Sequence, residues 1–489
     1  MMAVNLVHHF PFRPATVPAL LAILAIGGAA TPARAQSNPT SASNAFYGSV
    51  TLRPATEDTL KLSLDDAVSL GLKNNLGLKE AEAGEKLFQG EKNEAIQLFL
   101  PTITLTGDTG VHQQNLAALG FGPSALKEFA SLFPNGIPAG FSEITKVDLT
   151  EGQIHLSQTL FSGPVIAGFK AAGAAERSAY FAKMSARGEV VQQVATAYLH
   201  CIAASSEVDN AKALLSQDQL AFDNAHAAHL AGTVANLDEL RARVQLQSQQ
   251  QSLIAAQNAL EKDLILLKRE IGIDSGQKIT LTDPAPYSEL AAETPEEVRA
   301  IAYKNRQDYQ NLQNEAIEYK AFHNAYRAQR LPTLSFEGYY GVDQVSGVGS
   351  HGTMLAYASL KVPLFREAKL RGDNDAAAAQ QAAVDAQLAD LKNHIDEQVR
   401  AALLDLDANT RLVQVARSNV DLAARELSDE TDRVNAGVDD NLPLVTAQAT
   451  LASAQNNLVE SLYQYNLSKL ALARAAGVLE QQYRDYLGR

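Results

Sequence analysis

Apolar and polar residues along this chain follow two different periods, and the change between them marks where elements begin and end. Residues 63–98 have the spacing of an amphipathic helix that starts at Ser63, a hydroxyl residue able to cap a helix, followed within one turn by two acidic residues. Pro101 then ends the helix, because proline lacks an amide donor. Beyond it, Ile103 and Leu105 alternate with threonines, and this period of two predicts a β-strand.

The same order of elements occurs twice, which identifies an internal duplication. Residues 63–107 align without gaps on residues 294–338 at an offset of 231. Later matches have offsets of 204 or 205: Leu160-Phe161 with Leu364-Phe365, Gly232 with Gly437, and Gly272 with Gly477.

The change of offset from 231 to 204 means that the first copy holds 27 extra residues between Gly107 and Leu160. They fall within a stretch rich in Gly, Phe and Pro, 115–146, which we expect to be a long exposed loop.

The second copy repeats the local signals of the first. Thr294 is a second helix start, and Pro332 ends that helix. The remaining strand signals are three pairs of apolar residues at alternate positions: Leu334 and Phe336, Ile154 and Leu156, and Leu355 and Tyr357. Each copy is therefore predicted to contribute one β-hairpin, which gives four strands per chain.

Long helices are predicted for the rest of each copy. No proline follows Pro164 until after Leu230, so a helix of roughly 65 residues would extend on the order of 100 Å at 1.5 Å per residue. The return helices carry apolar residues at strict seven-residue spacing: Leu246, Leu253, Leu260 and Leu267, and in the second copy Leu451, Leu458, Tyr465 and Leu472. This repeat predicts antiparallel coiled-coil hairpins with a buried seam.

The start of the chain is typical of an export signal. An apolar stretch follows a polar and basic start and ends in Ala33-Arg34-Ala35, so the mature chain is expected to begin at Gln36. An uncleaved membrane anchor is the less favoured alternative. The predicted segments are a signal peptide (1–35), a lead that is flexible or draped along the outside (36–60), a first repeat (61–273), a linker (274–293), a second repeat (294–478) and a short polar tail (479–489).

Composition narrows the function further. The 489 residues carry a formal charge of −14, which argues against a nucleic-acid partner. Trp is absent and the only cysteine is Cys201, so cysteine-based metal sites and internal disulfides are excluded. No catalytic arrangement or phosphate-binding loop occurs, and we expect neither enzyme activity nor a cofactor.

Four strands cannot close a membrane barrel, which needs about eight or more. Three copies would supply twelve strands, and their hairpins, laid side by side, would form a hollow helical cylinder. The expected fold is therefore mixed and mainly α-helical, with long coiled-coil hairpins forming a tunnel and a transmembrane β-barrel built from four strands per chain.

The order of these motifs over residues 60–480 resembles the TolC family of outer-membrane efflux proteins. The resemblance rests on the duplication, the two Leu-Pro-Thr segments at the strand starts, Leu-Phe-Ser-Gly at 160–163 and the Gly-x4-Leu-Asp turn at 232–238. It implies a homotrimer in the outer membrane of a Gram-negative-type bacterium that extends into the periplasm. It also implies a passive exit duct for a tripartite efflux or type I secretion system, with a periplasmic adaptor and an inner-membrane pump as partners.

In that family the hairpin tips contact the adaptor. The resemblance thus assigns adaptor binding to these residues: Gly232, Thr233, Val234, Leu237, Asp238, Gly437, Val438 and Leu442. The two glycines also suit a plain helix reversal, which is compatible with binding.

The periplasmic gate departs from the family prototype. Pro443 and Thr446 stand at the usual acidic positions, and Asp439 and Val434 at the usual basic and tyrosine positions, while Asp238 is retained. We hypothesise that Asp439 and Asp440 of three chains form a substitute acidic ring; two solvated turn aspartates are the alternative.

Asp223, His226 and His229 share a helical spacing just before the first tip. This spacing suggests a metal site, but a solvated helix face explains it better, so no metal is expected. Two other protein classes compete with the duct: a periplasmic or surface coiled-coil scaffold, and an exported enzyme, for which no site was found.

Overall fold

The computed structural model describes residues 44–50, 54–119, 128, 144–232, 235–284, 287–291, 293–345, 349–436 and 441–488. The expected signal peptide and the expected mature start at Gln36 lie outside the described residues. Within these ranges, no helix combines the length and the apolar character that a membrane span requires.

Each copy begins with a short helix and a longer one: α1 (Leu64–Asn74) and α2 (Leu76–Gln97), then α6 (Pro295–Asn305) and α7 (Gln307–Ala328). Both predicted starts are confirmed, since Ser63 and Thr294 each form a capping box with the acid three residues later. The single helix predicted over 63–98 is wrong. The helix breaks at Asn75, whose extended backbone ends α1 while its side chain accepts a hydrogen bond from the Leu78 amide and caps α2.

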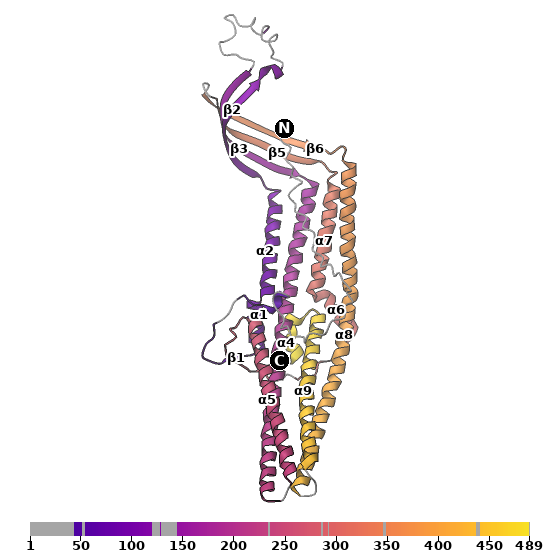
Figure 1. The fold of residues 1–489 in the computed structure, drawn as a ribbon. Helices are drawn as coiled ribbons and strands as arrows, with labels where there is room; N and C mark the ends of the chain where they lie inside the picture. The colour runs from indigo at the N-terminus through magenta and orange to yellow at the C-terminus, as the bar shows by residue number, and fades with distance from the viewer. Residues whose placement is uncertain are drawn as a thin grey trace, which may run out of the picture. The chain divides into compact units, whose positions relative to one another are not determined.

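Four strands follow the predicted order: β2 (Thr102–Asn115), β3 (Ile144–Phe161), β5 (Thr333–Val345) and β6 (Gly349–Lys361). They form one antiparallel sheet in the order β2-β3-β5-β6 (Figure 1). The loop predicted over 115–146 is too long at both ends, because β2 includes Asn115 and β3 begins at Ile144.

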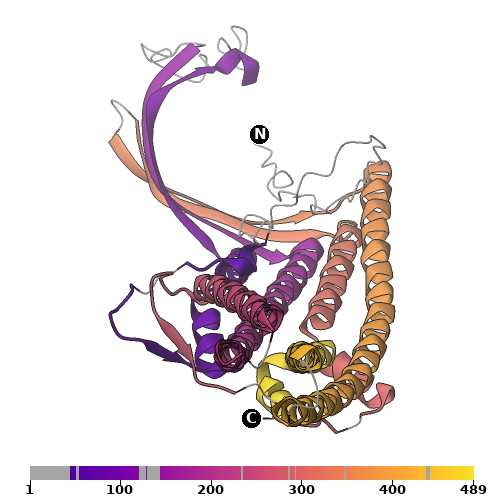
Figure 2. The ribbon, with the colours of Figure 1, turned by 60° about the horizontal axis from the view of Figure 1, so that its bottom comes forward.

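Four long helices form two hairpins: α4 (Gly163–Leu230) with α5 (Asn236–Ile271), and α8 (Glu367–Asn435) with α9 (Asn441–Ala475). α4 is continuous over 68 residues, as predicted. Figure 2 shows the magenta pair α4 and α5 beside the orange and yellow pair α8 and α9. The predicted seam faces inward along its length: five of its eight residues are buried (Leu246, Leu267, Leu451, Tyr465 and Leu472), and the other three are half-buried (Leu253, Leu260 and Leu458).

The largest core lies where the hairpins meet the short helices, around Val190, Val194, Tyr198, Leu267 and Leu472. The Tyr198 hydroxyl is hydrogen-bonded to the Leu62 carbonyl at 2.9 Å and to Asp283 at 2.7 Å. It thereby fixes β1 (Leu60–Leu62), which pairs in parallel with β4 (Ile279–Leu281). The boundary between the expected lead and the first repeat therefore pairs with the expected linker in a small sheet.

The chain end is a helix instead of the polar tail expected over 479–489. Helix α10 (Leu479–Leu487) buries Leu479, Tyr483, Tyr486 and Leu487 in the core. Arg187 of α4 forms a 2.6 Å ion pair with Glu480. These four residues are four, three and one positions apart, so they share one face of the helix. That apolar face packs onto the bundle.

Candidate functional site

The four-stranded sheet has one apolar and one polar face. Register places these exposed residues on the apolar face: Ile103, Leu105, Ile154, Tyr340, Val342, Met354 and Leu360. The opposite face carries Thr104, Asp108, Gln153, His155, Glu337, Asp343 and Lys361. Each apolar side chain listed on the first face is at least 48 % exposed in the single chain, with Leu105 at 79 %. A sheet with this division suits an apolar medium on one side and water on the other.

The return strand predicted from Leu355 and Tyr357 is confirmed as β6, but these two side chains lie on the polar face of the sheet. They pair there with Tyr339 and Glu337. The Tyr357 hydroxyl donates to Glu337 at 2.5 Å. The sequence around Leu355 is apolar at consecutive positions, so alternation alone could not choose the face.

Polar contacts bridge the strands across the polar face. The Gln153 amide donates to an Asp343 carboxylate oxygen at 3.1 Å, and the rings of His155 and Tyr339 lie 5.3 Å apart. These contacts join β3 to β5, the strands contributed by different copies, and so fix the two hairpins as one sheet.

The tip of the first hairpin reverses at Gly232, whose φ of +70° is a left-handed conformation that glycine adopts at low cost. Leu230 and Leu237 beside it are 73 % and 55 % exposed. Asp238 forms a 3.4 Å ion pair with Arg241 of its own helix. Thr233 and Val234 lie outside the described residues.

The tip of the second hairpin is described only in part. Gly437, Val438, Asp439 and Asp440 lie outside the described residues, and of Leu442 only the helical backbone is described. Their assigned roles in adaptor binding and gating therefore stay predictions.

The histidines near the first tip bind a residue that the sequence analysis did not single out. His226 Nδ1 lies 3.0 Å from a carboxylate oxygen of Glu239 on α5, and His229 Nε2 lies 3.9 Å from the other oxygen. Asp223 instead accepts a hydrogen bond from Gln219 at 2.9 Å. Glu239 thus brings His226 and His229 together, whereas Asp223 has a different partner, and no metal-binding group of three or more ligands occurs among the described residues.

A buried carboxylate lies in the seam of the same hairpin. Asp218 is 2 % exposed, and its Oδ1 receives no hydrogen bond within the described part of the chain. Gln245 donates to its other oxygen at 3.4 Å. The residue 205 positions later is Ala423, which packs in an apolar cluster with Leu427 and Leu451. At this position the seam of the first hairpin is therefore polar where that of the second is apolar.

Replacing Asp218 by alanine, as in the second copy, should raise the free energy of unfolding by about 1–3 kcal/mol at neutral pH, because a buried acceptor without a donor is removed. Burial raises the pKa of Asp218, so the cost of burying its negative charge declines as pH falls through that raised pKa. The stabilisation gained by Asp218→Ala should decline with it. Thermal unfolding followed by circular dichroism at pH 7 and pH 4 measures both effects. The exposed Asp223→Ala should change stability by less than about 0.5 kcal/mol; equal effects of the two substitutions would refute the explanation.

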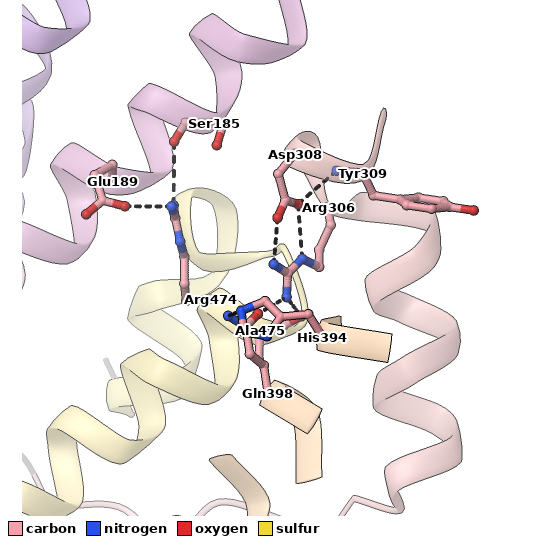
Figure 3. A network of polar contacts seen from close by, with 9 residues as sticks. All are labelled: Ser185, Glu189, Arg306, Asp308, Tyr309, His394, Gln398, Arg474 and Ala475. Atoms are coloured by element: carbon pink, nitrogen blue, oxygen red, sulfur yellow. Dashed lines mark hydrogen bonds and ion pairs between the residues drawn. The ribbon is translucent and has the colours of Figure 1, made fainter. Parts of the chain in front are cut away.

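A polar joint, which the sequence did not reveal, connects the helix break of the second copy to its return helix (Figure 3). Arg306 stands at the break between α6 and α7, and its guanidinium binds both oxygens of Asp308, at 3.0 and 2.6 Å. It also donates to Gln398 of α8 at 2.6 Å and to the Ala475 carbonyl at the end of α9 at 3.5 Å. Burial alone would raise the pKa of Asp308, but Arg306, the Tyr309 amide and Arg474 together outweigh it, and the pKa lies below its ordinary value.

The joint has a counterpart in the first copy. There the Asn74 amide donates to the Ile271 carbonyl, 2.9 Å away at the end of α5. Gly272 and Gly477 follow these helix ends with φ of +77° and +75°. A cavity of about 500 Å³ adjoins the second joint, where Arg474 of α9 binds Glu189 of α4 at 2.6 Å. The duplication thus ties each helix break to the end of its own return helix.

Comparison with known proteins agrees with this architecture. Three solved structures have the same fold. A membrane protein from Pseudomonas aeruginosa is 18 % identical, with a TM-score of 0.70, covering 85 % of this chain and 93 % of that one. The CmeC outer membrane channel of Campylobacter jejuni is 15 % identical, with a TM-score of 0.67 and coverages of 89 % and 92 %. The MtrE outer membrane channel of Neisseria gonorrhoeae in its open state is 17 % identical, with a TM-score of 0.66 and coverages of 88 % and 95 %.

A search of curated proteins gives no significant match. The model of a protein family described as outer membrane efflux protein matches residues 67–272 and 300–478, which include most of both copies. The chain belongs to the outer membrane efflux protein family.

Proposed function

We propose that three copies of this chain form a passive exit duct across the outer membrane and the periplasm, which carries substrates delivered by an inner-membrane pump. The observation that carries the proposal is the two-faced sheet. Its outer strands, β2 and β6, each have one edge that pairs with no other strand of the described residues and could pair with another copy. Three sheets joined edge to edge make a closed barrel of twelve strands, with the apolar face toward lipid and the polar face around water.

Strand length supports a membrane location. The four strands contain 14, 18, 13 and 13 residues. A tilted strand needs about 9–11 residues to cross the hydrocarbon core. Each strand is therefore long enough to span an outer membrane and extend beyond it.

Exposed apolar stripes on the long helices support the assembly below the sheet. One stripe on α8 contains Leu404, Leu412, Val415 and Leu422, and one on α5 contains Leu237, Leu240, Val244, Ile254 and Ile265. α5 packs on α4 and α8 packs on α9, so these stripes lie on the outer helices of the chain's two hairpins. Packing α8 of one copy against α5 of the next would cover both stripes and close a helical tunnel.

The tips of the hairpins are the proposed contact with a periplasmic adaptor, at Gly232–Asp238 and Gly437–Leu442. Leu230 and Leu237 offer exposed apolar surface there. The duct needs no energy source or cofactor of its own, because the pump drives transport. A coiled-coil scaffold would not need a sheet with one exposed apolar face, and family membership also disfavours it.

The decisive experiment is the detergent-corrected mass of the protein extracted from washed outer-membrane fractions. A particle of three chains supports the proposal. A single chain released by salt without detergent contradicts it and favours the scaffold.

Charge placed on the apolar face should impair the assembled sheet. Replacing Leu105 by arginine should cost about 2–4 kcal/mol, because the guanidinium would face hydrocarbon. The neighbouring Thr104→Arg, which faces the polar side, should be tolerated. The fraction of protein that resists heat dissociation in SDS gels measures the loss; equal sensitivity at both positions would argue against a lipid-facing Leu105.

The aspartates of the second tip are proposed as an acidic ring at the periplasmic entrance. Changing Asp439 and Asp440 to asparagine should abolish cation preference in single-channel recordings, because the fixed negative charge is removed. Unchanged selectivity would mean that both are solvated turn residues.

A further inference from the structure

Two large apolar side chains stand almost fully exposed where the sheet meets the helices. Leu364 and Phe365 follow β6 just before α8, and they are 93 % and 91 % exposed, more than any other large apolar side chain in the described ranges. Such a pair is costly to leave in water, which indicates that another surface covers it.

The duplication identifies what that surface looks like. The matching residues of the first copy, Leu160 and Phe161, are only 51 % and 42 % exposed, and helix α7 lies beside Phe161. Phe161 lines a cavity of about 330 Å³ between α4 and α7. Four α7-side residues line it too: Ala321, Asn324, Ala328 and Leu331.

The approach is close at the start of α4. A Cβ atom added to Gly163 would lie 2.9 Å from the Ala328 Cβ and 2.9 Å from a Leu331 methyl carbon. Within one chain, the strand exit of the first copy is thus seated on the second helix of the second copy.

The strand exit of the second copy has no such neighbour in the described part of its own chain. Subtracting the offset of 231 maps the α7 surface onto four residues at the end of α2: Gly90, Asn93, Gln97 and Leu100. All four are exposed, and their spacing of three, four and three places them on one stripe. One end of the chain therefore offers the apolar pair, and the other offers the matching seat.

We propose that Leu364 and Phe365 of one copy pack on the Gly90–Leu100 stripe of the next copy, repeating between chains the contact that Phe161 makes within a chain. This inference rests on the proposed three-chain assembly and names the joint that closes it. Because the seat and the pair occur once per chain, the contact is head to tail and closes only in a ring.

Side-chain size differs between the two contacts. Glu367 replaces Gly163, and Gln97 replaces Ala328. Glu367 is bound to Arg330 at 3.1 Å and to Arg371 at 2.7 Å, which directs it along the surface of its own chain. The contact between chains is therefore wider and more polar than its counterpart, with Phe365 as the apolar anchor.

Paired cysteines test the contact directly. In a Cys201→Ala background, Glu367→Cys with Gln97→Cys should yield covalent dimers and trimers on oxidation, since equivalent positions within the chain are close enough for a disulfide. The matched pair Gly163→Cys with Ala328→Cys should close within one chain and leave the chain monomeric in non-reducing gels. Neither Glu367→Cys nor Gln97→Cys alone should link chains.

A second variant separates assembly from folding. Phe365→Asp should retain the helical circular dichroism of the chain, because the side chain is exposed there, but should lose the three-chain particle. A three-chain particle that gives no cross-link while the control pair closes would overturn this inference and leave the proposed function standing. A single-chain mass for the unmodified protein would overturn both. Reaction of Phe365→Cys with a lipid-embedded maleimide in the intact particle would mean that lipid, and not a second copy, covers the pair.

Discussion

Replacing Arg306 by alanine should lower the free energy of unfolding by about 2–3 kcal/mol, because it removes a buried guanidinium that binds Asp308, Gln398 and the Ala475 carbonyl, although Asp308 itself is 39 % exposed. The Arg306 side chain is 10 % exposed, and its three guanidinium nitrogens make four hydrogen bonds that hold together the break between α6 and α7, helix α8 and the end of α9. Gly477 adds to the constraint, since a Cβ atom there would lie 2.7 Å from the Arg306 amide nitrogen. Thermal unfolding followed by helical circular dichroism measures the loss.

An ion pair made by an arginine of α6 provides a matched control for Arg306→Ala. Arg299 of α6 binds Asp396 of α8 at 3.2 Å, but its side chain is 38 % exposed, so Arg299→Ala should cost no more than about 1 kcal/mol. Arg306→Lys should recover only part of the loss, because an ammonium cannot bind both oxygens of Asp308 in the planar fork. Equal losses for Arg299→Ala and Arg306→Ala would contradict a special role of the joint.

The pH dependence of this loss is a further check. The pKa of Asp308 lies below its ordinary value, so the ion pair stabilises the fold in full at neutral pH and is lost as pH falls below about 4. The difference between Arg306→Ala and the unmodified protein should therefore narrow in acid. A difference that stays constant from pH 7 to pH 3 would assign the effect to packing.

Most of the fold could be predicted from repetition in the sequence. Periodicity predicted the strands and the long α4, because apolar spacing is a local signal that a strand or a long helix repeats many times. The seam leucines appear in both copies, and comparison of the copies separates conserved spacing from chance. The same comparison relates Gly272 to Gly477, but matched positions did not reveal the contacts of the joint beside Gly477.

What the sequence did not predict depends on contacts between distant residues. The pairing of β1 with β4 joins two strands that lie more than two hundred residues apart. Each strand has only three residues, which is too short for an alternating apolar pattern to be recognised. The break at Asn75 needs one side chain to cap the next helix, within a pattern that is helical on both sides. Asp218 and Glu239 were not singled out, because their burial comes from the partner helix and not from their own neighbours in sequence.

Lys469 is the clearest case of a charge that the fold holds at a cost. It is fully buried in α9, and its ammonium donates to the Ser288 hydroxyl at 3.1 Å and lies 4.6 Å from the centre of the Tyr465 ring. A second cation lies close by: the guanidinium carbon of Arg417 is 3.7 Å from the centre of the Tyr287 ring. Burial lowers the pKa of Lys469 to about 8. The residue 205 positions earlier is Leu264, which shows that the same seam accepts an apolar side chain.

Replacing Lys469 by methionine should therefore stabilise the fold by about 1–3 kcal/mol at pH 7. A shift from 10.5 to about 8 corresponds to roughly 3 kcal/mol at 1.36 kcal/mol per unit, and loss of the contact with the Tyr465 ring offsets part of it. The unfolded chain keeps this proton up to about pH 10.5, whereas the folded chain releases it near pH 8. The unmodified protein should accordingly gain stability as pH rises from 8 to 10.5, and the variant should not gain it.

Thermal unfolding measured at pH 7, 8.5 and 10 distinguishes this cause from a general effect of lost charge. Lys262→Met, at an exposed position of α5, should change neither the midpoint at pH 7 nor its dependence on pH. If Lys469→Met lowered the midpoint at pH 7, the ammonium would be contributing more through Ser288 and Tyr465 than its burial costs. In that case Lys469→Leu should also fail to stabilise the fold at pH 7, because it removes the same ammonium. This would hold even though leucine stands at the matching position of the first copy.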